Sequence, residues 1–391
     1  MAFKHGITVT EITSGARTLT AISTAIIGLV ATASDADEAT FPADKPVLIT
    51  DIETAIGKAG VAGTLARSLR AIADQARPIL VVVRVEEGET EAETASNVIG
   101  TVTAEGVKTG MQALLDAKSL QGVKPKILGT PGLETQAVTT ALAVVAQKLR
   151  GFGYARVIGD THAERAAYRA NFSARELMLL APDFLAWDTA ADAAVTSFAA
   201  ARAMGLRAQI DESTGPHKSL SNVVVNGVVG VSEPIRWDIE DQSTEAALLN
   251  ASEITALVRS DAGFIFWGNR TTADAESDFV FEGTVRVGQL LTDTMIQGMQ
   301  WANDKPLTPS LAKDIIETIN GLGRKLKASG VLLGFNCWFD EANNDVTSLK
   351  AGKLRIEYDY TVPPPLEDLG FNQRITGSYF ADFAAQLTEE V

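Results

Sequence analysis

The chain has 391 residues, of which 46% are hydrophobic and 21% are charged, a balance typical of globular proteins. This length exceeds one typical hydrophobic core, so we expect two or three domains. A formal net charge of −15 disfavours nucleic acid as a direct partner, because phosphate binding needs a basic surface. The single cysteine, Cys337, excludes an internal disulfide and a cysteine-rich metal site, and its neighbours Trp338 and Phe339 indicate that it is buried.

The N-terminal stretch, residues 1–20, is polar and extended, and its residues 5–12 can form a short strand. The apolar run 21–33 follows basic residues and so has the outline of a secretory signal. Glu11 interrupts the basic region and hydroxyl side chains dilute the apolar run, so we interpret the run as a buried strand. No run approaches the roughly 20 apolar residues that span a bilayer. We therefore expect a soluble protein made in the cytoplasm, without membrane insertion.

From residue 21 to about residue 250, apolar runs alternate with amphipathic stretches. The predicted strands are 26–31, 79–85, 127–128, 155–158 and 176–180. The predicted helices are one with Leu65, Leu69 and Ile72 on a single face, then 134–150, a helix around 162–172, and the alanine-rich stretch 190–204. The acidic stretch 86–93 and the glycine-containing stretch 205–230 predict surface loops. This alternation is typical of an α/β domain with a mainly parallel sheet.

Near residue 250 the pattern changes to that of an α+β region with late strands. In order, its predicted elements are the apolar runs 254–258 and 264–267, helices over 286–303 and 309–329, and a strand within 331–340. The second helix has the clearest signals. Thr308 suits the N-cap, Pro309 suits the first turn and Gly330 suits the exit.

The stretch 353–362 is the strongest strand signal in the chain. Its apolar side chains alternate with polar ones over five repeats, which predicts an antiparallel strand. Pro363, Pro364 and Pro365 end that strand, because proline cannot donate to a ladder and fixes φ. A second strand is predicted over 371–376. A last helix follows, with Phe380, Phe383, Ala384 and Leu387 on its apolar face.

This ending favours an assembly protein over a catalyst. A proline spacer leads out of the compact region toward a spare strand, and a spare strand can add to the sheet of another molecule. From the residues alone, both chain ends could instead pair with strand 353–362 of the same molecule.

Six sequence words, in order, resemble the tail sheath proteins of contractile-tailed phages, and R-type bacteriocin sheaths are similar. They are HGITVTEITSGART (5–18), KPVLITD (45–51), FLAWDT (184–189), RSDAGFIFWGNRT (259–271), NCWFDEANND (336–345) and AGKLRIEYDYTVPPPLEDL (351–369). Each word alone is weak evidence, but together they cover essentially the whole chain.

The resemblance implies a division of the chain. It implies an N-terminal arm over 1–20, an outer α/β domain over 21–250, an inner α+β domain over 251–365 and a C-terminal arm over 366–391. The outer domain would have a subtilisin-like fold with a mainly parallel sheet. The N- and C-terminal arms would be exchanged, each adding a strand to the inner domain of a neighbouring subunit.

The implied function is that of a structural subunit and not of an enzyme. Subunits would polymerise helically around a tail tube and contract to drive the tube through the host envelope for genome ejection. The implied partners are the subunit itself, the tail tube protein, and the baseplate and tail terminator proteins. The implied location is the virion, after assembly in the host bacterial cytoplasm. A bacteriocin or another contractile injection machine is an alternative setting for the same subunit.

The resemblance assigns three groups of residues. The exchanged strands would be Gly6, Ile7, Thr8, Val9, Thr10, Glu11 and Ile12 in one arm and Phe371, Asn372, Gln373, Arg374, Ile375 and Thr376 in the other. The arm spacer would be Pro363, Pro364 and Pro365. The cations facing the tube would be Lys313, Arg324, Lys325 and Lys327. These cations have a plainer alternative role, which is to complement the dipole at the end of a solvated helix.

The rival class is an α/β hydrolase or ligand-binding enzyme with a dimerisation domain, and catalytic motifs are the test of it. Three histidines, His5, His162 and His217, lie outside any nucleophile-elbow or papain-like pattern. The glycine turn 129–132 lacks the phosphate-loop lysine. The oxygen-rich loop 340–345 lacks the EF-hand spacing, so a solvated loop is favoured over a calcium site. We expect no catalytic residue, metal or cofactor.

Overall fold

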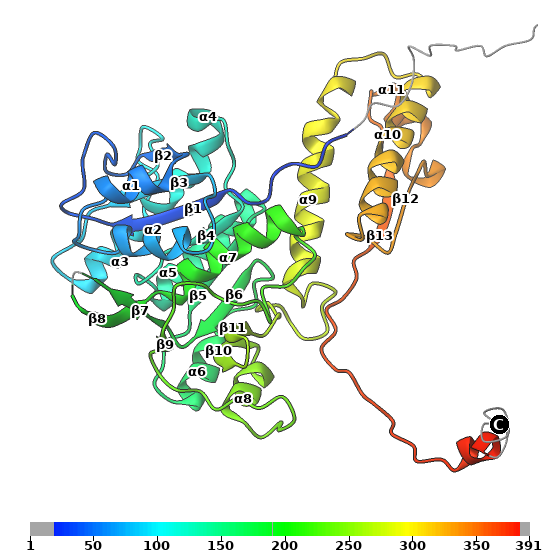
Figure 1. The fold of residues 1–391 in the computed structure, drawn as a ribbon. Helices are drawn as coiled ribbons and strands as arrows, with labels where there is room; N and C mark the ends of the chain where they lie inside the picture. The colour runs from blue at the N-terminus through cyan, green and yellow to red at the C-terminus, as the bar shows by residue number, and fades with distance from the viewer. Residues whose placement is uncertain (1–18, 190, 384–391) are drawn as a thin grey trace, which may run out of the picture.

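The computed structural model describes residues 19–189 and 191–383. The strand predicted over 6–12 lies outside these residues, as do His5, Ala384 and Leu387. The described chain forms a large region built around an eight-stranded sheet and a smaller region built around a two-stranded sheet (Figure 1).

The large sheet is mainly parallel, as predicted. Its strands in spatial order are β11 (Gly263–Trp267), β10 (Ile254–Ser260), β6 (Leu177–Ala181), β5 (Phe152–Arg156), β4 (Ile127–Gly129), β1 (Ile27–Thr32), β3 (Leu80–Val85) and β2 (Pro46–Ile49). Neighbours from β10 to β3 run parallel, whereas the edge strands β11 and β2 run antiparallel. Ile27 of β1 pairs with Leu80 of β3.

Both faces of this sheet are buried, which explains the continuous apolar runs in its sequence. Alternate side chains of β1 enter different cores, because side chains on a strand point to opposite faces. Ile27 and Leu29 belong to one hydrophobic cluster and Val30 belongs to the other. Each cluster is closed by its own layer of helices.

The helices divide between the two faces (Figure 1). One face is covered by α1 (Ile52–Lys58), α2 (Leu65–Ala73) and α7 (Ala199–Ser213). The other is covered by α3 (Glu91–Ile99), α4 (Ala117–Gln121), α5 (Gln136–Leu149), α6 (His162–Arg169) and α8 (Glu245–Ala251). Helix α2 and the adjoining α7 approach closely, since a Cβ at Gly205 would lie 2.8 Å from the carbonyl oxygen of Ile72.

Three local predictions in this region were wrong in part: the surface loop over 86–93, the helix over 190–204 and the loop from residue 205. Helix α3 begins inside the acidic stretch 86–93, because Thr90 and Glu93 form a capping box there. The stretch 190–204 is not one helix. Its first part contains β8 (Ala193–Ser197), which joins β7 (Phe184–Asp188) and β9 (Gly230–Val231) in a third sheet.

The helix expected over 190–204 is displaced toward the C-terminus. Helix α7 begins at Ala199, whose backbone N–H donates to the Asp183 carboxylate at 2.8 Å. It continues to Ser213, so the loop expected from Gly205 starts later. A carboxylate distant in sequence therefore sets this helix start, and local composition did not reveal it.

The sheet also extends past residue 250, where the second domain was expected to begin. Strand β10 pairs with β6 and β11 pairs with β10, so both apolar runs after residue 250 complete the large sheet. Short apolar runs do not indicate which sheet they join, because strand order depends on contacts distant in sequence.

Both edge strands of the large sheet are hydrogen-bonded by other segments of the same chain. At the β2 edge, the Gln121 side-chain N–H donates to the Pro46 carbonyl at 2.9 Å. At the β11 edge, the backbone N–H groups of Asn222 and Val225 donate to the carbonyls of Phe266 and Phe264 at 2.8 and 2.9 Å. These bonds occupy groups through which an edge strand would otherwise recruit another strand.

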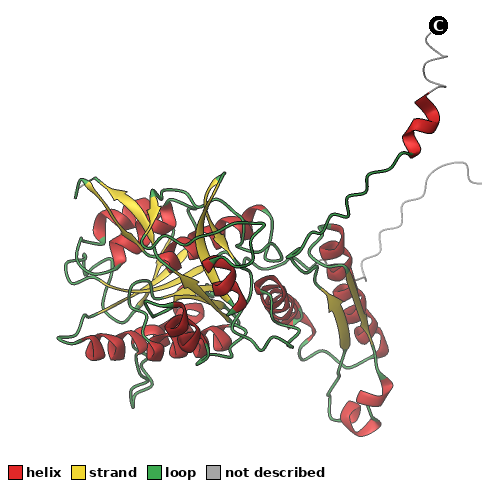
Figure 2. Cartoon of the chain, turned by 90° about the horizontal axis from the view of Figure 1, so that it is seen from below, coloured by secondary structure: helices red, strands yellow, loops and turns green. Residues whose placement is uncertain are grey.

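The smaller region contains α9 (Glu282–Gly298), α10 (Pro309–Ala328), β12 (Gly334–Trp338), α11 (Val346–Lys350) and β13 (Glu357–Thr361). Helix α9 lies between the large sheet and the layer of α10, β12 and β13 (Figure 2). Leu19 of the N-terminal lead packs with Val287, Leu291 and Leu322 in a third hydrophobic cluster. The cap of α10 is confirmed, since the Thr308 hydroxyl accepts from the Leu311 N–H at 3.2 Å.

The strand predicted over 353–362 is present but shorter. Strand β13 starts at Glu357, because the Asn344 side chain binds the backbone of Arg355 instead. Asn344 accepts from the Arg355 N–H and donates to the Arg355 carbonyl, both at 2.8 Å. The oxygen-rich loop 340–345 thus closes the β12–β13 connection through amide and carboxylate caps.

The chain after β13 has no regular structure until a short 3-10 helix, Ser378–Asp382, which Phe383 follows in α-helical conformation. The rest of the predicted last helix lies outside the described residues. Residues 371–376 do not form a strand within the described molecule. An extended segment satisfies its backbone hydrogen bonds by pairing with a neighbouring strand. None of the sheets in the described chain includes residues 371–376. The alternative of pairing between 371–376 and strand 353–362 of the same molecule is therefore not adopted.

Candidate assembly surfaces

The two-stranded sheet has one open edge in the described part of the chain. Strands β12 and β13 pair antiparallel, with Cys337 opposite Tyr358. On the outer side of β12, the Asn320 amide of α10 accepts from the Cys337 N–H and donates to its carbonyl, both at 2.9 Å. Within the described residues β13 pairs only with β12. Asn320 therefore occupies the middle of one edge, and the edge along Tyr358 and Tyr360 remains available for another strand.

The aromatic side chains of this sheet form a continuous row. Phe335 stacks on Tyr358 with ring centroids 6.0 Å apart, and Tyr358 stacks on Tyr360 at 6.2 Å. Cys337 is buried, as predicted, and burial raises the pKa of its thiol to about 11. The thiol therefore stays protonated at neutral pH and acts as a small apolar side chain.

The C-terminal arm leaves the body directly after the spacer Pro363–Pro365 and extends away from both regions (Figure 1). Its apolar side chains are exposed to an unusual degree, with Ile375 98% exposed and Phe371 86% exposed. The other exposed large apolar residues of the arm are Leu366, Leu369, Tyr379, Phe380 and Phe383. An extended segment with this many exposed large apolar side chains marks an interaction site.

One ion pair holds the base of the arm. Arg270, which follows β11, donates through Nε and Nη2 to the two carboxylate oxygens of Glu367 at 3.1 and 2.8 Å. Both side chains are partly exposed, so water screens the pair and its contribution is small. The contact nevertheless fixes where the arm starts relative to the large sheet.

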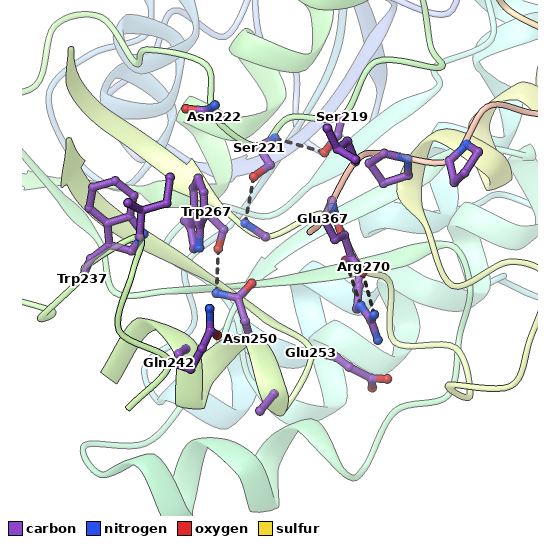
Figure 3. A pocket seen from close by; sticks show the side chains of 18 of the residues that line it. Ser219, Ser221, Asn222, Trp237, Gln242, Asn250, Glu253, Trp267, Arg270 and Glu367 are labelled. Carbon is purple, nitrogen blue, oxygen red and sulfur yellow. Dashed lines mark hydrogen bonds and ion pairs between the residues drawn. The ribbon is translucent and has the colours of Figure 1, made fainter. Parts of the chain in front are cut away.

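A cleft of about 850 Å³ lies beside this base, between α8, β11 and the proline spacer (Figure 3). Trp237 and Trp267 lie side by side in its wall and pack edge to face, with ring centroids 5.2 Å apart. Ser221 Oγ accepts from the Gly268 N–H at 3.1 Å, and Asn250 donates to the carbonyl of Trp267 at 3.1 Å. These polar side chains therefore support the local backbone.

The described lining of this cleft does not combine its serines and histidine into a nucleophile and base. Ser219 Oγ accepts from the Ser221 N–H, and His217 Nδ1 has no hydrogen-bond partner. Burial, with the nearby charge of Arg207, lowers the pKa of His217. In the described ranges, no group of three or more His, Cys, Asp or Glu side chains could hold a metal ion.

The four cations predicted to face a tube are all exposed on α10, but they do not form one cluster. Lys313 lies on the second turn, about 17 to 21 Å along the helix axis from the other three at 1.5 Å per residue. Arg324, Lys325 and Lys327 lie together near the C-terminal end, where they complement the helix dipole. Arg324 also pairs with Glu317.

A buried charge network that we did not expect fixes the start of α9. Glu282, in the first turn of α9, accepts from Tyr154 of β5 and from Arg207 of α7, the latter at 3.3 Å. Arg207 also pairs with Asp211 at 2.8 Å, and Asp211 in turn pairs with Arg286. These five side chains join α9 to the large sheet and to α7.

The opposite charges in this network stabilise one another in their ionised forms. Burial alone would lower the pKa of Arg207, but Asp211 and Glu282 outweigh it and raise that pKa above its usual value. Burial, together with Glu282, raises the pKa of Tyr154, so its hydroxyl remains a donor. The pairs Arg207/Asp211 and Glu282/Arg286 are each spaced i, i+4 on a helix, which is the one signal of this network in the sequence.

A second charged group fixes α9 about two to three turns further along. Asp293 accepts from Arg150 Nε at 2.6 Å and from Lys126, and Lys124 lies 3.4 Å away. Burial lowers the pKa of Lys126 to about 8, against the opposing effect of Asp293. Two polar anchors thus hold α9 rigidly against the large region.

Comparison with known proteins identifies the family. Three family models match this chain: the tail sheath protein Gp18 domain III N-terminal region at 24–85, the phage tail sheath protein central domain at 106–272, and the phage tail sheath C-terminal domain at 274–376. The chain is 53% identical to the tail sheath protein of Escherichia phage P2 over 98% of both chains. It is 43% identical to the major tail sheath protein of Serratia phage KSP20, again over 98% of both.

Solved structures share the fold at low sequence identity. The contracted sheath complex of the extracellular contractile injection system PVC superposes with a TM-score of 0.73 at 15% identity, covering 97% of this chain and 99% of that one. The contracted helical sheath of the anti-feeding prophage gives a TM-score of 0.72 at 20% identity, covering 94% of this chain and 98% of that one.

The chain belongs to the phage tail sheath family, and the resemblance carried by its six sequence words is confirmed. It is a subunit of a contractile tail sheath, and tail sheath proteins are components of the virion. None of the helices in the described part of the chain is long and apolar enough to cross a membrane.

Proposed function

We propose that this subunit polymerises into a helical sheath around a tail tube by exchanging strands with its neighbours. The observation that carries the proposal is a matched pair of features in one molecule. Strand β13 has an open edge, and the arm beyond Pro365 exposes apolar side chains over residues 366–383. The segment Phe371–Thr376 of one subunit would add to the inner sheet of the next, with main-chain bonds for strength and side chains for register. Residues Gly6–Ile12 would add a further strand from another neighbour.

The large region would be the outer domain, with a subtilisin-like fold. An eight-stranded, mainly parallel sheet with helices on both faces supports this assignment at the level of architecture. Because β10 and β11 complete that sheet, we place the boundary of the inner domain between Trp267 and Glu282 and not at residue 251. The matched central and C-terminal family domains divide in the same interval.

The C-terminal end of α10 would face the tail tube. Arg324, Lys325 and Lys327 give this exposed surface a positive charge on an otherwise acidic chain. A few partly screened charge pairs hold a contact weakly, which suits a sleeve that later slides along the tube. Lys313 would contribute separately, because it lies about three turns away.

Contraction would release strain stored in the extended lattice. A signal from the baseplate would let subunits rotate outward as rigid units while the arms act as hinges. The two polar anchors of α9 support rigid rotation, since they hold the inner and outer parts of one subunit together. The sheath would assemble in the host bacterial cytoplasm with baseplate and tail terminator proteins, and contraction would drive the tube through the envelope for genome ejection.

Deletion of residues 366–391 tests the proposal. We expect the truncated chain to fold as a monomer and to form no tubes in negative-stain electron microscopy at concentrations where the full chain forms them. Ile375→Asp should have the same effect, because Ile375 is exposed in the free subunit and only assembly would bury it. Leu120→Asp, a matching change at an exposed position on α4, is the control and should leave tubes intact. Normal tubes from the truncated chain would overturn strand exchange.

A further inference from the structure

The two faces of the two-stranded sheet differ in what covers them. Residues opposite each other in an antiparallel pair share a face, so the register of β12 and β13 sorts their side chains. The first face consists of Phe335, Cys337, Tyr358 and Tyr360. Helices α9 and α10 cover it, since a Cβ at Gly323 would overlap the Phe335 ring and a Cβ at Gly288 would lie 2.8 Å from the Tyr360 hydroxyl.

The second face of this sheet is largely exposed. It consists of Asn336, Trp338, Glu357, Asp359 and Thr361. Glu357 accepts from the Asn343 amide at 3.0 Å. The Asp359 carboxylate, by contrast, has no hydrogen bond or ion pair within the described residues. An unpaired carboxylate therefore lies in the middle of the strand whose edge is open.

The segment Phe371–Thr376 of the C-terminal arm also has two different sides. In an extended chain, Phe371, Gln373 and Ile375 lie on one side, and Asn372, Arg374 and Thr376 lie on the other. Arg374 is the only cation between residues 366 and 383, and it is exposed without an ion pair in the described chain. One side of the segment is thus mainly apolar, and the other carries a single positive charge.

Burial decides which side of the segment joins the covered face of the sheet. In one orientation, Ile375 lies beside Tyr358 and Tyr360 and is removed from water. The reverse orientation would leave Phe371 and Ile375 in water and bring the Arg374 charge toward the apolar cluster beneath the sheet, which is less favourable. The apolar side therefore joins the covered face, and Arg374 falls on the exposed face of β13.

Charge then selects the register. Shifts that keep each side on its face move the segment by two residues at a time, so Arg374 meets one of three residues. They are Glu357, Asp359 and Thr361. Glu357 is already held by Asn343, and Thr361 carries no charge. Because opposite charges on neighbouring strands stabilise the pair, the unpaired Asp359 is the favoured neighbour, whether the segment runs parallel or antiparallel to β13.

We propose that Arg374 of one subunit pairs with Asp359 of the next and thereby sets the register of the exchanged strand. The inference rests on the strand exchange proposed above, and it adds which side of the segment faces inward and how the two strands align. Main-chain hydrogen bonds can form in several registers, so side chains must select among them.

Charge reversal tests the pair. Asp359→Arg and Arg374→Asp each place like charges side by side, so the critical concentration for tube formation should rise at least about fivefold. Sedimentation with negative-stain electron microscopy measures it. The double variant Asp359→Arg/Arg374→Asp restores opposite charges and should polymerise within about twofold of the unmodified chain. A double variant as impaired as the single variants would overturn the proposal.

Folding of the variants is checked separately. Both positions are exposed in the free subunit, so the melting temperature of each monomeric variant should change by less than about 2 °C. Asp261→Arg makes the same charge change at an exposed turn between β10 and β11 and should leave the critical concentration unchanged. An equal rise in this control would assign the effect to net charge and contradict the pair.

Mixing the two single variants shows whether the pair joins two molecules. In an alternating polymer, the reversed arm of Arg374→Asp meets the reversed edge of Asp359→Arg, and each unmodified arm meets an unmodified edge. We therefore expect the equimolar mixture to form tubes below the critical concentration of either variant alone. A mixture that polymerises no better than its components would contradict a contact between subunits.

The same measurements distinguish this register from strand exchange itself. If both single variants polymerise like the unmodified chain while the chain without residues 366–391 does not, strand exchange holds and the register is wrong. If the truncated chain also forms normal tubes, the arm is not exchanged and both proposals fail.

Discussion

The eight-stranded sheet of the large region and the two-stranded sheet of the small region differ in whether their edge strands have hydrogen-bond partners. In the large sheet, Gln121 covers the β2 edge and the segment from Asn222 to Val225 covers the β11 edge. In the small sheet, Asn320 occupies the middle of the β12 edge, and β13 has no further partner in the described chain. A two-stranded sheet is marginal by itself. The comparison teaches that both edge strands of the large sheet have partners within the molecule, whereas β13 keeps a free edge in the described chain, the edge that we propose a neighbour completes.

The largest expected effect on stability lies in the large region. Phe152→Ala removes a fully buried ring that packs 5.2 Å from Tyr154, and we expect the free energy of unfolding to fall by about 3–5 kcal/mol. Urea unfolding of the monomer measures this. Ile375→Ala, at an exposed position on the arm, should change it by less than about 0.5 kcal/mol. Equal losses at the two positions would contradict the contrast between the regions.

The next largest effect tests the joint between the two regions, meaning the buried charge network that attaches α9 to the large region. Glu282→Gln keeps the shape of the side chain but leaves Arg207 with one carboxylate fewer, so we expect a loss of about 2–4 kcal/mol. Differential scanning calorimetry should then show the two regions unfolding less cooperatively. The exposed change Glu53→Gln, which breaks a surface pair with Arg77, is the matched control and should cost under about 1 kcal/mol. A similar cost for both would mean that the network does not hold the joint.

A pH dependence follows from Glu134, at the carboxyl edge of the large sheet. Burial, reinforced by Asp183, raises the pKa of Glu134 from 4.5 to about 7. The folded chain therefore binds this proton more tightly than the unfolded chain does. The resulting stability is fully present below about pH 4.5 and is lost as the pH rises through 7, by roughly 1–3 kcal/mol.

Glu134→Gln isolates this contribution. The neutral amide cannot titrate, so the change in melting temperature between pH 4.5 and pH 7.5 should shrink relative to the unmodified chain. Glu240→Gln alters an exposed carboxylate of the same region and should leave the profile unchanged. Identical profiles for Glu134→Gln and the unmodified chain would refute the assignment.

The smallest effect tests the protected edge of β12. Asn320→Ala removes both hydrogen bonds to the backbone of Cys337, and we expect a loss of about 1–2 kcal/mol. Amide exchange should accelerate at Cys337 and not in β3 of the large sheet. Unchanged protection at Cys337 would indicate that another group occupies this edge.

Local patterns predicted those elements whose signals are themselves local. The strand β3 is a continuous apolar run, and α10 carries its own cap at Thr308, so both were expected close to their observed bounds. The start of α7 was misplaced because the Asp183 carboxylate, 16 residues earlier, sets it. The same limit explains β10 and β11, whose partners in the sheet cannot be read from their own residues.

The candidate sites also differ in whether local sequence alone predicts them. The proline spacer and the exposed arm follow from composition, because proline ends a strand wherever it occurs. The anchors of α9 depend on Glu282 and Asp293 meeting cations from α7, from the residue before β4 and from the end of α5, which only the folded chain brings together. The proposed partner of β13 is a strand of a second molecule, which the residues of one chain do not identify.

The segment that contains the proline spacer also limits how far the C-terminal arm can reach from the body. Val362 is the last buried residue before the arm, and Phe371 begins the proposed exchanged segment nine residues later. Nine residues of extended chain reach about 30 Å at most. Each subunit thus carries a tether of fixed maximum reach, and any lattice built from it, long and narrow or short and wide, must keep those two points within that distance.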